Sequence, residues 1–124
     1  FDEIPMKRRR TRHFDSRKVP ASRTGEPGFE PETNKVLQEL RAVSEESGYS
    51  MADLALKWVC ANPNLTCNLA GASSPAQLIK NAKALSKELE APLLQRLNKA
   101  STPLRDQMGN HIDLFESIEN DRTI

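Results

Sequence analysis

A single segment of this chain has the pattern of a β-strand, whereas four others have the pattern of α-helices. Residues 65–70, Leu-Thr-Cys-Asn-Leu-Ala, run into Gly71 as a short strand would. One strand has no partner for its backbone hydrogen bonds, and a stable sheet needs several strands. We therefore expect its neighbouring strands to come from outside these 124 residues.

Start and stop signals bound the first two helices. Apolar residues recur with helical spacing from Glu32, and Gly48 can end that helix in a left-handed conformation. The Ser50 hydroxyl can cap a second helix while Asp53, three positions on, reaches back in an aspartate version of the capping box. This helix should end near Ala61, because the Asn-Pro pair that follows disfavours the helical conformation.

The third helix has the strongest local start signal in the sequence. Ser74 is a capping residue, Pro75 suits the first helical position, and Gln77 completes the capping box. A fourth helix is expected over residues 92–100, after which Pro103 and a polar tail predict an irregular terminus. The chain should thus be mostly helical within an α/β fold.

Composition limits the class of protein. Hydrophobic residues make up 37% of the chain, which is less than a typical globular domain has, so the core should be thin. No run approaches the roughly 18 apolar residues that cross a bilayer, and no secretory signal pattern is present. These features favour a cytoplasmic protein without membrane contact. Because Phe1 opens a polar, loop-like stretch, we also expect the chain to be a fragment.

Two cysteines and one tryptophan are candidates for special roles, but structural roles are favoured for all three. Cys60 and Cys67 are too few for a disulfide framework, and their spacing fits no zinc pattern. We expect two buried free thiols and no metal site. Trp58 lies on the apolar face of the second helix, and an anchoring role in the core is favoured over a ligand contact.

The net charge of +1 conceals an asymmetry. Residues 7–24 carry a charge of +7 and the rest of the chain carries −6. Eight basic residues in this segment stand against Asp15 alone, namely Lys7, Arg8, Arg9, Arg10, Arg12, Arg17, Lys18 and Arg23. So many like charges, followed by glycines and prolines, are not expected to bury themselves, and the segment is predicted to be a long loop or arm.

The end of the strand and the start of the third helix form a candidate anion site. Gly71 can turn the chain tightly off the strand, and the unpaired N–H groups of the new helix attract negative charge. Ser73 offers a hydroxyl, while Gln77 and Asn81, four residues apart, project from one helix face. On geometry alone, a well-capped helix that faces water explains the same residues and is favoured.

Several of these motifs together resemble the aldo-keto reductases, a family of (β/α)8 barrels that use NADPH. The motifs are residues 53–59, Asn62-Pro63, residues 69–75, Gln77-Leu78 and Asn81. The resemblance implies that residues 1–124 are the C-terminal part of one such TIM-barrel domain. In that reading, residues 1–32 are the basic loop after strand 7, residues 33–100 hold helices, strand 8 and the cofactor-binding turn, and residues 101–124 are a C-terminal extension.

The resemblance also implies roles for individual residues in binding NADPH. The adenosine 2′-phosphate and the adenine are expected to be held by Gly71, Ala72, Ser73, Gln77 and Asn81.

Positive side chains should complete this site. Where many relatives have Glu, this chain has Lys80, which removes a contact to the adenine and adds charge near the phosphate. Arg10 best matches the loop arginine that stacks on the adenine or pairs with the phosphate, and Arg8, Arg9 and Arg12 are its alternatives.

The catalytic Asp, Tyr, Lys and His of the family lie in the first half of its barrel, and nothing in this chain corresponds to them. Tyr49, His13 and His111 are expected to be non-catalytic. The resemblance thus implies part of an oxidoreductase that reduces small aldehydes or ketones. Two other functions stay open. One is a non-enzymatic binding subunit of the potassium-channel β-subunit type. The other, which is less favoured, is a nucleic-acid-binding arm in which only Phe14 offers a stacking surface.

Overall fold

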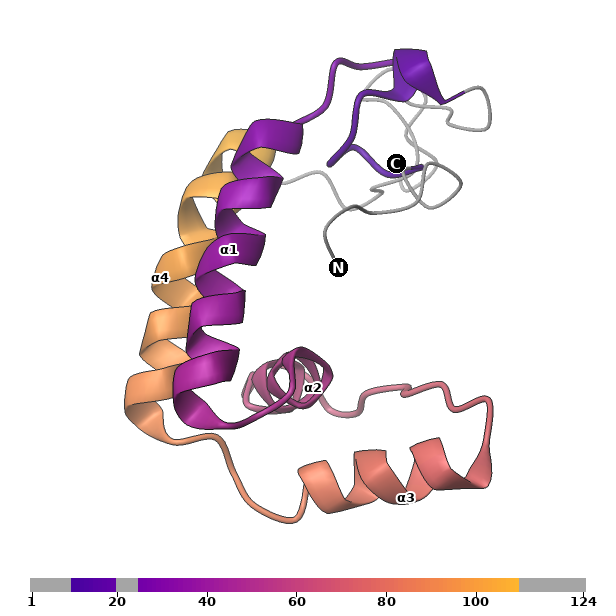
Figure 1. Cartoon of the computed structure of the whole chain (residues 1–124), viewed down its shortest axis with the longest axis vertical. Helices are drawn as coiled ribbons and strands as arrows, with labels where there is room; N and C mark the ends of the chain where they lie inside the picture. The colour runs from indigo at the N-terminus through magenta and orange to yellow at the C-terminus, as the bar shows by residue number, and fades with distance from the viewer. Residues whose placement is uncertain (1–9, 20–24, 110–124) are drawn as a thin grey trace. The chain divides into compact units, whose positions relative to one another are not determined.

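The computed structural model describes residues 10–19 and 25–109. Within them lie a short 3₁₀ turn, η2 (Ser16–Lys18), and four α-helices, α1 (Glu30–Ser47), α2 (Met51–Cys60), α3 (Pro75–Ala84) and α4 (Ala91–Met108) (Figure 1). The chain divides into two compact units. Of the described residues, 10–19, 25–37 and 101–109 belong to the terminal unit, and residues 38–100 form the central unit.

The end of α1 and the start of α2 use the capping signals of the sequence. Gly48 has a φ of +74°, and its N–H donates to the carbonyl of Ser44 at 3.0 Å. The Ser50 hydroxyl accepts a hydrogen bond from the N–H of Asp53 at 3.2 Å. Among the described residues, the Asp53 carboxylate makes no return bond to Ser50, so only half of the predicted capping box is formed.

The prediction for α4 was too short. This helix runs from Ala91 to Met108 and therefore passes through Pro103, although the sequence led us to expect an end near residue 100. A proline inside a helix removes one backbone hydrogen bond. The helix nevertheless continues because its residues Leu97, Leu104 and Met108 are all buried, and burial of an apolar face stabilises a helix more than local propensity does.

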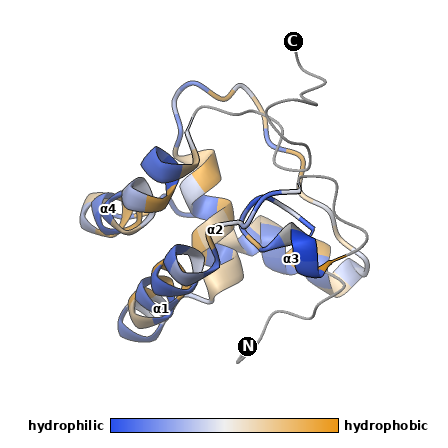
Figure 2. Cartoon of the chain, turned by 90° about the horizontal axis from the view of Figure 1, so that it is seen from above, coloured by the Kyte–Doolittle hydropathy of each residue, from blue (hydrophilic) through white to orange (hydrophobic). Residues whose placement is uncertain are grey.

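The most apolar helix, α2, supplies the middle of the core of the central unit (Figure 2). Val43, Leu54, Leu89 and Leu97 form the buried cluster, and Val43 is completely enclosed. Partly buried side chains pack against it, namely Leu40, Tyr49, Leu93 and Leu94. Burial of each such aliphatic side chain contributes roughly 1.5–3 kcal/mol, so these few contacts hold the central unit together.

Trp58 and the two cysteines were wrongly predicted to be buried. The Trp58 side chain is exposed, and its indole Nε1–H donates to Asn98 Oδ1 at 2.6 Å. Cys60 and Cys67 are both free and both exposed. The described residues are too few to cover the sides of α2 and of the following connection that carry these groups.

The strand expected over residues 65–70 is not formed. The connection between α2 and α3 has no regular secondary structure (Figure 1). Leu69 is 100% exposed and Leu65 is 46% exposed. The described residues provide no neighbouring strand, so this segment has no ladder of hydrogen bonds to join. The apolar stripe of α3 is exposed too, at Leu78, Ile79 and Leu85.

In the terminal unit, residues 10–19 are packed and do not form a solvated arm. Phe14 and Val19 are buried, although they lie within the most basic part of the sequence. Gly28 has a φ of +73° and lies against this segment. A Cβ atom at Gly28 would come within 2.3 Å of the Phe14 carbonyl carbon, so only glycine fits there.

Paired charges explain how a basic segment can be buried. Arg12 is only 4% exposed; its Nε donates to Glu26 Oε2 at 3.0 Å and its Nη1 donates to the Met108 carbonyl at 3.4 Å. Asp15 accepts two side-chain hydrogen bonds from Arg17, each of 2.9 Å. The hydrogen bond from Arg17 holds the pKa of Asp15 far below its usual range. For residues 12–19 the prediction of a segment unable to bury itself was wrong, because the buried charges of Arg12 and Asp15 have partners. Residues 7–9 and 20–24 of the predicted arm lie outside the described residues.

Candidate functional site

The start of α3 is built by side-chain hydrogen bonds from the turn before it. Ser74 has an extended backbone and its hydroxyl accepts from the N–H of Gln77 at 3.2 Å, which confirms the predicted cap. The Gln77 side chain folds back, and its Oε1 accepts from the N–H of Ser73 at 2.7 Å and from the Ser73 hydroxyl at 2.9 Å. These three bonds fix residues 73–77 in one compact turn.

Gly71 does not have the conformational role that we expected. Its φ is not among the positive values, which occur within the described residues at other glycines. A Cβ atom at Gly71 would meet nothing within 4 Å. Because residues 65–70 form no strand, the chain makes no sharp exit at this point and does not require a glycine.

The first turn of α3 leaves one backbone donor free. Pro75 has no N–H, and the N–H groups of Gln77 and Leu78 are bound by the side chain and the carbonyl of Ser74. The N–H of Ala76 has no partner within the described residues. No acidic residue lies in this turn, so its positive helix dipole is not neutralised locally.

Five of the six predicted cofactor-binding residues lie in one continuous segment of the central unit. Gly71, Ala72, Ser73 and Gln77 are exposed, and Asn81 is half-buried one turn further along α3. We expected Gln77 and Asn81 to face one region together, but the carbonyl oxygen of Gln77 is turned back to Ser73. The sixth residue, Arg10, is exposed and belongs to the terminal unit.

The three alternatives to Arg10 differ in burial and in whether they lie among the described residues. Arg12 is buried by its bonds to Glu26 and to a main-chain carbonyl, so its guanidinium is not presented to a ligand. Arg8 and Arg9 lie outside the described residues. Arg10 is thus the one arginine of this group that the described part of the chain presents at the surface.

A cluster of lysines near this turn was missed by our sequence reasoning. Residues 54–87 contain four lysines and no aspartate or glutamate. Lys80, Lys83 and Lys87 are exposed, whereas Lys57 is only 4% exposed. The Lys57 ammonium lies 5.1 Å from the centre of the Tyr49 ring and donates to the carbonyl of Lys87. The lack of carboxylates and the spacing of three and four between the lysines were the available signals.

These lysines line a cleft of about 230 Å³ between α2 and α3, which we call the lysine cleft. Its lining consists of Tyr49, Asp53, Lys57, Lys80, Lys83, Ala84, Ser86 and Lys87. The hydroxyl of Tyr49 donates to Glu90 Oε1 at 3.1 Å. This hydrogen bond raises the pKa of Tyr49, and the pKa of Glu90 is lowered by its own backbone N–H and then by Tyr49.

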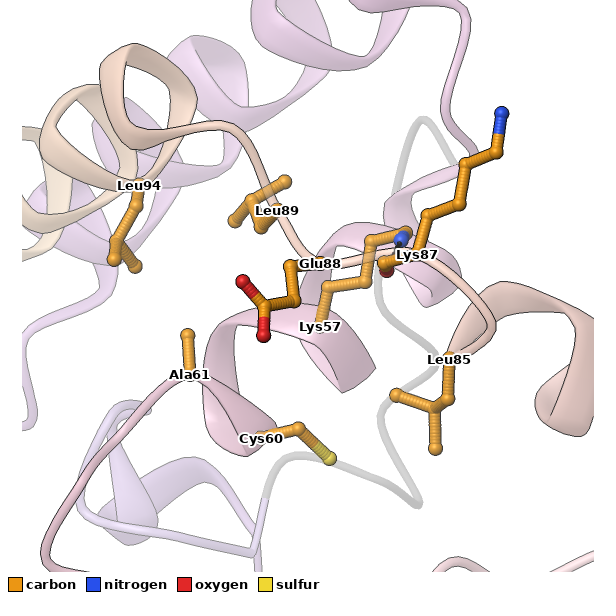
Figure 3. Close-up of a pocket in the computed structure, with 8 residues that line it drawn as sticks. All are labelled: Lys57, Cys60, Ala61, Leu85, Lys87, Glu88, Leu89 and Leu94. Atoms are coloured by element: carbon orange, nitrogen blue, oxygen red, sulfur yellow. Dashed lines mark hydrogen bonds between the residues drawn. The ribbon is translucent and has the colours of Figure 1, made fainter.

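A second cavity of about 340 Å³ lies beside the end of α2 and the segment that leads into α4 (Figure 3). It is lined by Lys57, Cys60, Ala61, Leu85, Lys87, Glu88, Leu89 and Leu94. The side chains of Lys87 and Glu88 point in opposite directions (Figure 3). The lining contains the exposed thiol of Cys60 together with Lys57, Lys87 and Glu88, and it contains no histidine.

The two histidines are the remaining candidates for proton transfer. Burial, and then the neighbouring Arg12 charge, lowers the pKa of His13. His111 lies outside the described residues. Within residues 10–19 and 25–109 no group of three His, Cys, Asp or Glu is placed to hold a metal ion. None of the described helices combines the length and the apolar character that a membrane crossing needs.

Comparisons with known proteins link the chain to one family. A sequence model described as "Aldo/keto reductase family" matches residues 3–102. A probable voltage-gated potassium channel subunit beta of Oryza sativa subsp. japonica is 35% identical over 54 residues, which are 44% of this chain and 16% of that relative. A putative voltage-gated potassium channel subunit beta of Schizosaccharomyces pombe is 32% identical over 84 residues, which are 62% of this chain and 24% of that relative. The chain thus spans a quarter or less of these relatives. No solved structure gives a significant match.

Proposed function

The chain belongs to the aldo/keto reductase family, whose members fold as (β/α)8 barrels, and from this premise we propose a role in binding NADPH. Residues 71–81 hold the adenosine 2′-phosphate end of the cofactor in this proposal. The activity that they serve is the reduction of an aldehyde or ketone, in which the cofactor supplies the hydride. We assign the chain cofactor binding and no catalytic residue.

The exposed, capped start of α3 is the observation that carries this proposal. A 2′-phosphate brings about −1.5 to −2 charges, which the N-terminus of a helix favours. The free N–H of Ala76 and the Ser73 hydroxyl are donors at this point, and no carboxylate in the turn opposes the anion. A phosphate oxygen would replace Gln77 Oε1 as the acceptor for the Ser73 hydroxyl.

Arg10 supplies a charge-assisted hydrogen bond to the same phosphate or stacks on the adenine. The test uses the protein at its full natural length and measures dissociation constants for NADPH and NADH. Arg10→Ala should weaken NADPH about 10- to 150-fold, because one such bond contributes roughly 1.5–3 kcal/mol. Lys18→Ala is the matched control, since Lys18 is exposed and pairs with Asp15 at 3.5 Å, and it should change neither constant. Equal constants for the two cofactors in the unmodified protein would contradict the assignment.

A second candidate is a regulatory subunit that binds the cofactor without turning it over. The names of the two relatives, both of them channel β subunits, favour this function. Steady-state NADPH consumption with a panel of aldehydes and ketones separates the two candidates. Turnover near the typical enzyme value of about 10 s⁻¹ supports the reductase, whereas tight NADPH binding without turnover supports the regulatory subunit. A cytoplasmic location stays a prediction, which cell fractionation tests.

A further inference from the structure

The lining of the lysine cleft in the central unit carries a net positive charge. Four lysines and one aspartate line it, which gives a net charge of +3. Lys80, Lys83 and Lys87 are exposed, and among the described residues none of them forms a close ion pair, although Lys87 interacts electrostatically with Glu90. We propose that the lysine cleft is an anion site separate from the cofactor turn, and that it binds a small ligand with two or more phosphate groups.

Backbone bonds hold the lysines on one rim before any ligand arrives. Lys80 and Lys83 are three residues apart and therefore lie on one side of α3. Where the helix ends, the N–H and the hydroxyl of Ser86 both donate to the Lys83 carbonyl, at 3.2 and 2.8 Å. The buried Lys57 then ties the Lys87 carbonyl to α2. The direction of the chain from Lys83 to Lys87 is thus fixed by the fold.

Nearby carboxylates offset part of this charge. Glu88 follows Lys87 directly, but the two side chains point in opposite directions (Figure 3). Glu90 accepts a hydrogen bond from the hydroxyl of Tyr49 and interacts electrostatically with Lys57 and Lys87, so it offsets part of the charge. Asp53 is the one carboxylate in the lining, so an anion that enters the cleft meets a positive field.

The size and chemistry of the cleft favour clustered phosphates over a nucleotide. Its volume of about 230 Å³ is below the roughly 300–1,000 Å³ of sites that enclose drug-sized ligands. Its cations are ammonium groups, which bind phosphate as point charges without reading its shape. Lys57 lies over the Tyr49 ring, so this ring is not free to stack on a base. The ligand is therefore recognised by its phosphates, whether they belong to a soluble molecule or to a lipid headgroup.

The direct test titrates inorganic tripolyphosphate into the protein at its full natural length, with and without saturating NADPH, by calorimetry. The double variant Lys83→Ala/Lys87→Ala should bind tripolyphosphate about tenfold more weakly or worse. Lys35→Ala/Lys99→Ala is the matched control, because it also removes two exposed lysines and changes the net charge equally. The control should bind within about twofold of the unmodified protein, and neither double variant should change the dissociation constant for NADPH.

A second arm identifies the source of the phosphates. Phosphatidylcholine vesicles with and without phosphatidylinositol bisphosphate are sedimented with the protein. Sedimentation that requires the bisphosphate and is lost in Lys83→Ala/Lys87→Ala assigns the site to a headgroup, whereas tripolyphosphate binding without sedimentation assigns it to a soluble ligand.

Three results would overturn the proposal, and the first two do not involve the cofactor. They are an absence of tripolyphosphate binding, an equal loss of affinity in the two double variants, and displacement of tripolyphosphate by NADPH in direct competition. The last result would show that the lysines belong to the cofactor site. Failure of NADPH to bind at all would instead count against the proposed function and leave the lysine cleft intact.

Discussion

Residues 10–19 and residues 61–74 are both connections without a long helix or a strand, yet the first is packed and the second is open. Arg12, Asp15 and Val19 are buried in the terminal unit. In the central unit, Leu69 is fully exposed. The difference lies in the partners that each segment finds within the described residues. In residues 10–19, Arg12 can be buried because Glu26 and the Met108 carbonyl accept its hydrogen bonds. In residues 61–74, Leu69 is exposed because no described strand pairs with this segment.

The largest difference in stability is expected between alanine substitutions of glycines in the two regions. Gly28→Ala should destabilise the terminal unit by about 2–4 kcal/mol, because alanine is strained at positive φ and its Cβ would collide with the Phe14 backbone. Gly48→Ala has the positive φ without the collision and should cost about 1 kcal/mol. Gly71→Ala has neither and should change stability by less than about 0.5 kcal/mol. Urea unfolding, with amide hydrogen exchange as the probe, measures the stability of the three variants. If Gly71→Ala lost as much stability as Gly28→Ala, the proposed difference between the two regions would be wrong.

Removal of the buried arginine should have the next largest effect. Arg12→Met deletes the bond to Glu26 and the bond to the α4 carbonyl, and it should cost about 1–3 kcal/mol. Lys18→Met, at an exposed ion pair, should cost less than about 0.5 kcal/mol. Thermal unfolding of the two variants measures the difference. If the two losses are equal, residues 10–19 are not packed through Arg12.

Acid should loosen the terminal unit through His13. Its pKa in the folded chain lies below the ordinary value of 6.5, so protonation favours the unfolded state. The stability it contributes is present above about pH 6.5 and is lost as the pH falls through the lowered pKa. The urea midpoint should therefore fall between about pH 7.5 and 5.5, and His13→Asn should flatten this part of the profile. A profile that His13→Asn leaves unchanged would assign the acid sensitivity to another group.

The smallest effect is expected in the open connection. In the 124-residue chain, Leu69→Ser should change the free energy of unfolding by less than about 0.5 kcal/mol, because the leucine side chain is completely exposed. Denaturant unfolding followed by the fluorescence of Trp58 reports on this unit. A loss of 2 kcal/mol or more, as for a buried leucine, would mean that this segment is covered.

Local signals in the sequence were sufficient for the helix boundaries that depend on caps. Ser50 and Ser74 cap the helices predicted for them, and Gly48 ends α1. Features that depend on distant residues were not predictable in this way. The continuation of α4 through Pro103 depends on burial of its apolar face. Trp58 is exposed because no described segment covers its side of α2.

The same distinction applies to the candidate sites. The turn at residues 71–77 is continuous in sequence, so its motif could be recognised from the residues alone. The lysine cleft combines Tyr49 and Lys57 with lysines more than twenty residues further on, and Lys57 joins them through the carbonyl of Lys87. A main-chain carbonyl carries no signal in the sequence, so this contact became visible only in the fold.

The claim that the start of α3 receives the 2′-phosphate can be tested most directly at the N–H of Ala76. Amide resonances of the protein at its full natural length are recorded during titration with 2′,5′-ADP and, separately, with 5′-AMP, which lacks the 2′-phosphate. We expect the Ala76 and Ser73 amide resonances to shift strongly with 2′,5′-ADP and little with 5′-AMP. Equal shifts with both ligands, or shifts confined to Lys83 and Lys87, would contradict it.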